Sequence, residues 1–137
     1  MKNKKNIYTM IDANVNRAKE GLRVIEDVSR FIISDKKTTS KLKNIRHDID
    51  SALKMISADH LVLLKNRHTD DDAGRHGKNK GEFTRTSTLD IMVSNFKRVE
   101  ESFRVLEEIS KLIDPSAAYV FKELRYKTYE LEKETLI

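Results

Sequence analysis

The chain has 137 residues, the length of one domain with room for a sizeable hydrophobic core. It has no cysteine, which excludes disulfides and thiolate chemistry and suits a cytoplasmic protein, and no apolar run indicates a signal peptide or membrane span. Charged residues make up 36% of the chain against four glycines and one proline, a composition typical of helical bundles. The net charge of +5 is compatible with nucleic acid, a membrane surface or a small phosphorylated substrate.

A first helix is predicted from about Ile7 to Ile33, because apolar residues recur there every three or four positions. We expect its core face to consist of Ile11, Val15, Ala18, Leu22, Ile25, Val28 and Ile32. Asp35 is the expected N-cap of a second helix that ends near residues 57–59. The apolar face of that helix is Leu42, Ile45, Ile49, Ala52, Leu53 and Ile56.

The middle of the chain is less regular. His60–Leu64 is a short apolar run that periodicity does not assign to helix or strand. A polar connection is expected over about residues 65–85, and its central part, Arg67–Gly81, holds three of the four glycines. Loops of this length are usually functional or disordered.

A third helix is predicted to begin between Thr84 and Asp90, with Ser87 or Thr88 as its cap. Its core face is expected to be Met92, Phe96, Val99, Phe103, Leu106, Ile109 and Ile113. Asp114 followed by Pro115 indicates a cap and the first residue of a fourth helix. That helix carries Phe121, Leu124, Leu131 and, less regularly, Leu136.

An internal repeat relates the two halves. Residues 14–31 return at 95–112, and the identical pairs are Asn14/Asn95, Arg17/Arg98, Glu20/Glu101, Arg23/Arg104, Val24/Val105, Glu26/Glu107 and Ser29/Ser110. At an offset of 79, residues 42–47 answer residues 121–126. We therefore predict an all-α fold, a four-helix bundle formed by two repeated helical hairpins (about 7–59 and 86–136) joined by a long polar loop, with 1–137 as one domain.

The repeat preserves polar residues, which two merely amphipathic helices would not require. Asn14 and Gly21 fall near the centre of the apolar face and Arg17 on its shoulder, so Asn14, Arg17 and their twins are expected at or beside the core. A buried amide or guanidinium needs partners. Glycine costs a helix interior up to ~1 kcal/mol, so Gly21 indicates close approach by another backbone or a ligand.

Two interpretations of these polar residues stay open. In the functional one, Arg17, Arg98, Arg46 and Arg125 hold phosphates, while Glu20, Glu101 or loop aspartates hold Mg²⁺. In the other, the Arg-x-x-Glu and Glu-x-x-Arg spacings form surface ion pairs between residues three apart, worth ~0.2–0.5 kcal/mol each. For Arg23, Glu26, Arg104 and Glu107, the two interpretations have equal support.

The loop offers weaker signals. Asp70, Asp71 and Asp72, beside Arg67 and Gly74, are either solvated or anchor a metal–phosphate, and their spacing is not that of an EF-hand. Residues 75–81, with Lys78 and Lys80, could cradle a nucleotide phosphate but lack the Walker A ending. The four histidines show no zinc-site spacing.

Several segments together resemble a known family. They are residues 11–27, 42–48, 67–69 with 72–74, 95–108 and 124–126, and the block Asn14-x-x-Arg17-x-x-Glu20-Gly21-x-Arg23 is the most specific. The family is the alternative hydroxymethylpyrimidine phosphate kinase, unrelated to the ribokinase-like enzyme and found alone or fused ahead of thiamin-phosphate synthase. The chain departs from its pattern at His68, Ala73 and Ser102.

The resemblance implies transfer of the γ-phosphoryl group of ATP, with Mg²⁺, to 4-amino-5-hydroxymethyl-2-methylpyrimidine phosphate; the free alcohol is not a substrate. On this basis the expected catalytic residues are Arg17, Arg98, Glu20 and Glu101. The expected substrate-binding residues are Asn14, Asn95, Arg23, Arg104, Arg46, Arg125, Arg67 and Gly74, and Asp72 is the expected Mg²⁺ ligand. The loop is expected to close over ATP.

Two other functions remain as alternatives. One is a non-catalytic regulatory or docking module of a thiamin-phosphate synthase. The other is a basic helical nucleic-acid binder, which is disfavoured because aromatic residues are few and no helix carries a concentrated basic stripe. The sequence predicts no membrane partner and leaves a homodimer open.

Overall fold

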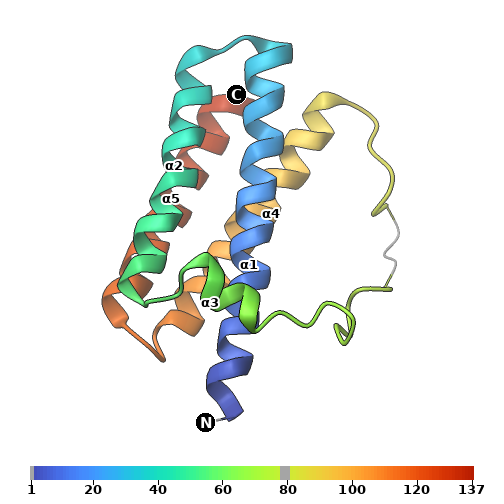
Figure 1. Ribbon diagram of the computed structural model, residues 1–137. Helices are drawn as coiled ribbons and strands as arrows, with labels where there is room; N and C mark the ends of the chain where they lie inside the picture. The colour runs from blue at the N-terminus through green and yellow to red at the C-terminus, as the bar shows by residue number, and fades with distance from the viewer. Residues whose placement is uncertain (1, 78–80) are drawn as a thin grey trace.

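The computed structural model describes residues 2–77 and 81–137, and over these ranges the regular structure is entirely helical (Figure 1). The elements in chain order are α1 (Lys2–Asp27), a π-helical turn η1 (Val28–Ile33), α2 (Lys36–Met55), the short α3 (His60–Lys65), α4 (Thr88–Ser110) and α5 (Pro115–Leu136). The all-α class predicted from composition and periodicity is confirmed.

The four long helices form two hairpins, α1 with α2 and α4 with α5, that pack against each other. Helix α1 lies along α4, and α2 lies along α5, so the order around the bundle is α1, α2, α5, α4. In Figure 1, α1 and α4 run in opposite directions, as do α2 and α5. The predicted four-helix bundle of two repeated hairpins is therefore confirmed, and the order of its helices is now defined.

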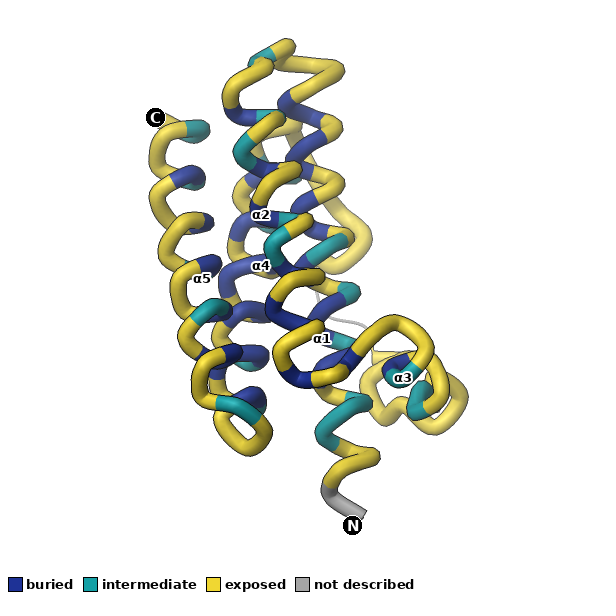
Figure 2. Tube along the Cα trace, turned by 60° about the vertical axis from the view of Figure 1, so that its left-hand side comes forward, coloured by how far each residue is buried: buried dark blue, intermediate teal, exposed yellow. Residues whose placement is uncertain are grey.

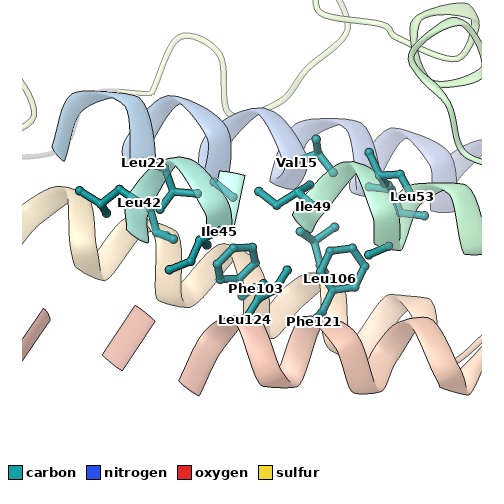
Figure 3. Close-up of a cluster of buried hydrophobic side chains, with 14 of the residues drawn as sticks. Val15, Leu22, Leu42, Ile45, Ile49, Leu53, Phe103, Leu106, Phe121 and Leu124 are labelled. Carbon is teal, nitrogen blue, oxygen red and sulfur yellow. The ribbon is translucent and has the colours of Figure 1, made fainter. Parts of the chain in front are cut away.

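The hydrophobic core runs along the axis of this bundle. Figure 2 shows the buried stripes of the long helices facing one another, and Figure 3 shows residues from all four helices meeting in the centre. The largest fully buried side chains are Phe96, Phe103 and Phe121. These are core positions that the 3.6-residue period predicted, because a stripe of apolar residues on each helix must be removed from water.

The predicted helix starts are confirmed by their capping bonds. The Asp35 carboxylate accepts from Thr38 N at 3.1 Å, Ser87 Oγ accepts from Asp90 N at 3.1 Å, and the Asp114 carboxylate accepts from Ser116 N at 2.9 Å. The run His60–Leu64, which periodicity left unassigned, belongs to helix α3, which packs on α1.

Two predicted core positions at the helix ends are wrong: Ile32 is 62% exposed and Ile113 is 38% exposed. Helix α1 stops following the α-helical period at Asp27, and each π-helical turn contains about one extra residue, which rotates later side chains by about 100°. Helix α4 ends at Ser110, so Ile113 has already left the helix. Periodicity assumes an unbroken 3.6-residue helix and fails at both places.

Gly21 lies where α1 and α4 come closest. A Cβ atom at this position would lie 2.7 Å from Val99 Cγ2 and 3.3 Å from the Asn95 carbonyl oxygen. The close approach that the sequence predicted is therefore confirmed, and the approaching element is helix α4.

The connection between the hairpins follows α3 and ends at the Ser87 cap. Its described residues from His68 to Ser87 are exposed. The predicted phosphate cradle at 75–81 includes Lys78, Asn79 and Lys80, which fall outside the described residues. Over residues 2–77 and 81–137, no helix combines the length and apolar character needed to cross a membrane.

Candidate functional site

A cleft of about 940 Å³ lies along the first half of α1, and we call it the α1 cleft. Residues 5–20 of α1 form its floor, residues 67–72 of the connection border it, and Val105 of α4 closes it. Of the predicted site residues, the cleft is lined by Asn14, Arg17, Glu20, Arg67 and Asp72. Residues from three separate parts of the chain therefore meet here.

Asn14, Arg17 and Glu20 face the cleft together because residues three apart lie on one side of a helix. Asn14 is buried, and its Nδ2 donates to the Met10 carbonyl oxygen at 2.9 Å. Its Oδ1 accepts from Arg17 Nη1 at 3.4 Å. Arg17 itself is exposed, and no carboxylate of the described residues forms an ion pair with it. Its guanidinium is therefore available to an anion.

Arg67 joins the connection to α1 through a bidentate ion pair with Asp12. Arg67 Nε lies 2.7 Å from Asp12 Oδ2, and Nη2 lies 2.9 Å from Oδ1. This hydrogen bonding, with the attraction of the carboxylate, raises the pKa of Arg67 above its ordinary value. Neither bond uses Nη1. Arg67 was expected to bind substrate, and the structure adds that it fixes the border of the cleft.

Asp12 is not among the site residues predicted from the sequence. Its position next to the core residue Ile11 indicates a carboxylate at the edge of the core, which needs a hydrogen-bond partner. In the structure Asp12 is buried. Asn16 Nδ2 also donates to Asp12 Oδ1 at 3.1 Å. A second tie between α1 and the connection is Thr9 Oγ1, which donates to the Asn66 carbonyl oxygen at 2.9 Å.

The loop acids border the cleft from the other side. Asp71 and Asp72 line it, and Asp72 Oδ1 accepts from Gly74 N at 2.8 Å. Gly74 is exposed, and a Cβ there would lie 3.5 Å from Asp72 Oδ1, an ordinary contact. The described structure therefore gives no steric reason for a glycine at position 74, where substrate binding was expected.

The charges that remain in the α1 cleft are mixed. Lys5 and Arg17 lack an ion pair within the described part of the chain, and Glu20, Asp71 and Asp72 bring three carboxylates. Arginine and lysine suit phosphate oxygens, and carboxylates suit hard divalent cations. This combination fits a phosphate-bearing ligand that brings a metal ion better than it fits a bare anion.

No cluster of three or more His, Cys, Asp or Glu side chains in residues 2–77 and 81–137 is arranged to hold a metal ion. Mg²⁺, however, is commonly held by one or two carboxylates, substrate phosphates and water. The oxygen donors Glu20, Asp71 and Asp72 fit that mode of binding.

The twins in the second repeat have a different setting. Asn95 Nδ2 donates to the Ile91 carbonyl oxygen at 2.8 Å, which repeats the bond of Asn14. Arg98 and Glu101 are exposed on α4 and do not line the α1 cleft. Among the described residues, the first copy of the repeated Asn, Arg and Glu therefore lines the α1 cleft and the second copy does not.

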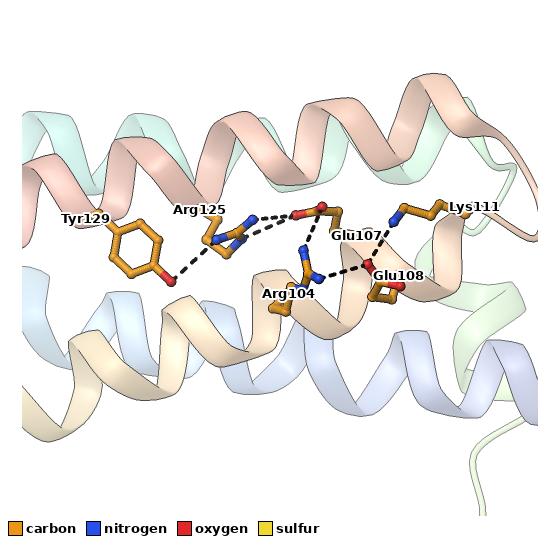
Figure 4. A network of polar contacts seen from close by, with 6 residues as sticks. All are labelled: Arg104, Glu107, Glu108, Lys111, Arg125 and Tyr129. Carbon is orange, nitrogen blue, oxygen red and sulfur yellow. Dashed lines mark hydrogen bonds and ion pairs between the residues drawn. The ribbon is translucent and has the colours of Figure 1, made fainter.

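The remaining four predicted arginines belong to ion pairs that brace the hairpins. Arg46 Nε on α2 lies 3.2 Å from Glu26 Oε2 on α1, and Arg125 Nη2 on α5 lies 3.0 Å from Glu107 Oε1 on α4. Arg23 and Arg104 pair with the same glutamates at 3.9 and 3.1 Å. Figure 4 shows the second of these networks. The predicted pairs between residues three apart thus form at Arg23 and Arg104, whereas Arg46 and Arg125 pair between helices.

Fold and cleft together define a class: a small, internally duplicated helical bundle with a charged cleft beside its connecting loop. The chain belongs to the ThiD2 family, whose sequence profile matches residues 9–134. No solved structure matches the chain.

Curated relatives carry the name thiamine-phosphate synthase. The chain is 38% identical to the protein from Synechocystis sp. over 130 residues, 36% identical to that from Nostoc punctiforme over 131, and 33% identical to that from Rhodopirellula baltica over 128. These matches cover 93–95% of this chain but only 34–36% of each relative. The chain therefore spans about a third of the length of these relatives, and the matches connect it with thiamin biosynthesis.

Proposed function

We propose that the chain is a kinase that transfers the γ-phosphoryl group of ATP to 4-amino-5-hydroxymethyl-2-methylpyrimidine phosphate, giving the diphosphate. Family membership and the thiamine-phosphate synthase relatives support the pathway. The observation that carries the proposal is the α1 cleft, where Arg17, which forms no ion pair among the described residues, lines the same surface as the carboxylates of Glu20 and Asp72.

This reaction requires positive charge and alignment of the two substrates more than it requires a general base. An ionised oxygen of the substrate phosphate attacks the γ-phosphorus, the bond from that phosphorus to the β,γ-bridging oxygen breaks, and ADP leaves with the electron pair. The attacking oxygen carries no proton that must be removed. The protein has to bring two anions together and stabilise the charge on the transferred group.

The charged side chains of the cleft and the Asn14 amide each have a role in this proposal. Arg17 and Lys5 offset the phosphate charge, and Arg67 holds the loop in position through Asp12. The free lone pair and N–H of the Asn14 amide could pair with the aminopyrimidine ring. Asp72, with Asp71 and Glu20, would hold Mg²⁺, which when bound neutralises charge on the phosphates of ATP.

The test is an assay that couples ADP release to a spectroscopic signal, with purified protein, MgATP and the pyrimidine phosphate. We expect ADP release with the phosphate and none with the free alcohol. Because a charge-stabilising group of this kind is worth about 10²–10³ in rate, Arg17→Ala should lower kcat/KM by about that factor and leave the helical circular dichroism unchanged.

The twin variant Arg98→Ala shows whether one cleft or both repeats take part. If only the α1 cleft acts, Arg98→Ala keeps its activity. If both variants lose activity, the second repeat contributes as the sequence predicts. Unchanged kinetics in Arg17→Ala would remove Arg17 from the mechanism.

The alternative function is a non-catalytic docking or regulatory module, which is favoured by the length of the relatives, about three times that of this chain. It predicts that folded protein binds phosphate ligands without releasing ADP. In that case activity should be sought in a mixture of this chain with a thiamine-phosphate synthase.

A further inference from the structure

A second pocket, of about 860 Å³, lies where α1 passes through η1 into α2, and we call it the η1 pocket. It shares no lining residue with the α1 cleft. Five basic side chains line it, and only two acidic ones do, Glu26 and Asp35. The basic residues are Arg23, Arg30, Lys36, Lys43 and Arg46.

Both acids in the η1 pocket are already engaged. Glu26 receives Arg46 through two bonds, at 3.2 and 3.4 Å, and lies 3.9 Å from Arg23. Asp35 accepts from Thr38 N at 3.1 Å and from Thr38 Oγ1 at 2.8 Å, as the cap of α2. Throughout the described ranges, no carboxylate forms an ion pair with Arg30, Lys36 or Lys43. The pocket therefore carries an uncompensated positive charge.

The second hairpin contains the same framework, with the cation that corresponds to Arg30 paired to a carboxylate. There, the position of Arg30 is taken by Lys111, which lies 2.7 Å from Glu108, and Glu108 also lies 3.3 Å from Arg104 (Figure 4). In the first hairpin the counterpart of Glu108 is Asp27, an exposed residue with no ion pair among those the structure describes. The basic residue at this repeated position is thus paired with a carboxylate in the second hairpin and is not paired with one in the first.

We propose that the η1 pocket binds the diphosphate or triphosphate group of a small-molecule ligand. Three cations that pair with no carboxylate of the described residues, with Arg23 partly available, match the several negative charges of such a group. The guanidinium of Arg30 stacks over the Phe31 ring, 4.6 Å from its centroid, and its planar fork suits phosphate oxygens. The side chains of Ser34 and Ser40 add hydroxyl donors. The volume admits a whole nucleotide, whereas a single phosphate would engage only part of the cation cluster.

This inference does not depend on the proposed kinase activity, because binding to the η1 pocket is measured without turnover. The ligand could be a nucleotide or another diphosphate ester, and the shared chemistry is the chain of phosphates. Inorganic pyrophosphate tests that chemistry alone. ATP and AMP, compared with it, show whether a nucleotide is the source.

The experiment is titration calorimetry of the full chain with pyrophosphate, using variants matched through the repeat. Lys43→Ala removes a pocket cation, and Lys122→Ala removes the exposed lysine at the same position of the second hairpin. We expect Lys43→Ala to raise the Kd about tenfold and Lys122→Ala to leave it unchanged. Arg30→Ala and Lys111→Ala form a second matched pair with the same expectation.

Arg17→Ala separates the η1 pocket from the α1 cleft. Retained pyrophosphate binding in Arg17→Ala, with loss in Lys43→Ala, supports the proposal, and competition by ATP but not AMP then identifies a nucleoside triphosphate as a source. Equal effects of Lys43→Ala and Lys122→Ala would show a diffuse charge effect and overturn it. Loss of pyrophosphate binding in Arg17→Ala alone would also overturn the proposal. So would a protein that binds anionic lipid vesicles through the exposed residues 31–33 but does not bind pyrophosphate.

Discussion

At the scale of single residues, the buried carboxylate of Glu100 stands out. Its side chain is 3% exposed, and Lys97 Nζ lies 3.5 Å both from it and from Glu132 on α5. Burial, followed by the hydrogen bond and the charge of Glu132, raises the pKa of Glu100 to about 7. Oε2 of Glu100 has no hydrogen-bond partner in the described residues, so full ionisation leaves a poorly compensated charge in the core.

Glu100 should therefore make the fold less stable as the pH rises. Below about pH 4.5 the group is protonated in both states, and between pH 4.5 and 7 the unfolded chain loses the proton first. The free energy of unfolding should fall over this range by at most about 3 kcal/mol, relative to a Glu100→Gln variant. Urea unfolding of both proteins at several pH values measures this difference.

An exposed carboxylate supplies a control of opposite sign. Hydrogen bonding to Lys41 lowers the pKa of Glu134, so its contribution is present at neutral pH and is lost as the pH falls through the lowered value. In Glu134→Gln, the free energy of unfolding should therefore fall less at acid pH than it does in the wild-type protein. A pH dependence that is the same in wild type and Glu100→Gln would contradict the role given to Glu100.

At the scale of the elements, the crossing of α1 and α4 depends on Gly21. Alanine is the better helix former by up to ~1 kcal/mol, but its Cβ would meet the stiff, buried side chain of Val99 at 2.7 Å. We expect Gly21→Ala to lower the free energy of unfolding by about 1–2 kcal/mol through overpacking. Thermal or urea unfolding followed by circular dichroism measures it.

The repeat suggests the compensating change. Ser102 is the twin of Gly21, and Ala18 is the twin of Val99, so α1 carries the smaller residue at both repeated positions. Gly21→Ala combined with Val99→Ala should therefore cost less than the sum of the single changes. Additive effects would show that the close approach does not limit this crossing.

The ion pairs within the second hairpin should differ sharply in their contributions. Glu107 is 8% exposed and receives both Arg104 and Arg125, so Glu107→Gln leaves the largely buried guanidinium of Arg125 without its carboxylate partner and should cost about 3 kcal/mol. Arg104 is 56% exposed, and Arg104→Ala should cost less than about 1 kcal/mol. Urea denaturation compares the two variants. Equal costs would show that burial does not decide the strength of these pairs.

The helices and their caps could be predicted because both depend on local pattern: apolar residues every three or four positions, and Asp35, Ser87 and Asp114 before the helix starts. Ile32 and Ile113 could not, because a π-helical turn and an early helix end leave no periodic signal. In the site, Asn14 and Arg17 followed from the repeat. The partnership of Asp12 with Arg67 did not, because it joins residues 55 positions apart that only the fold brings together.

At the scale of the whole molecule, the bundle is two hairpins that share one core, since α1 packs along α4 and α2 along α5. Each hairpin alone would expose the apolar face that the other covers. A chain cut in the connecting loop, giving fragments 1–77 and 81–137, should therefore reassemble. We expect the mixture to form a one-to-one complex with more helix than the sum of the separate fragments, measured by circular dichroism and analytical ultracentrifugation.

The differences between the two repeats also determine whether unlike or like fragments form the more stable complex. Two copies of the second fragment would bring Ser102 against Val99, where the intact chain places Gly21. Two copies of the first would bring Gly21 against Ala18 and leave space unfilled, which also costs stability. Unlike fragments should thus pair in preference to like ones, and Gly21→Leu in the first fragment should prevent the pairing. Fragments that form equally helical homodimers, with no further helix on mixing, would show that the two halves have not become complementary.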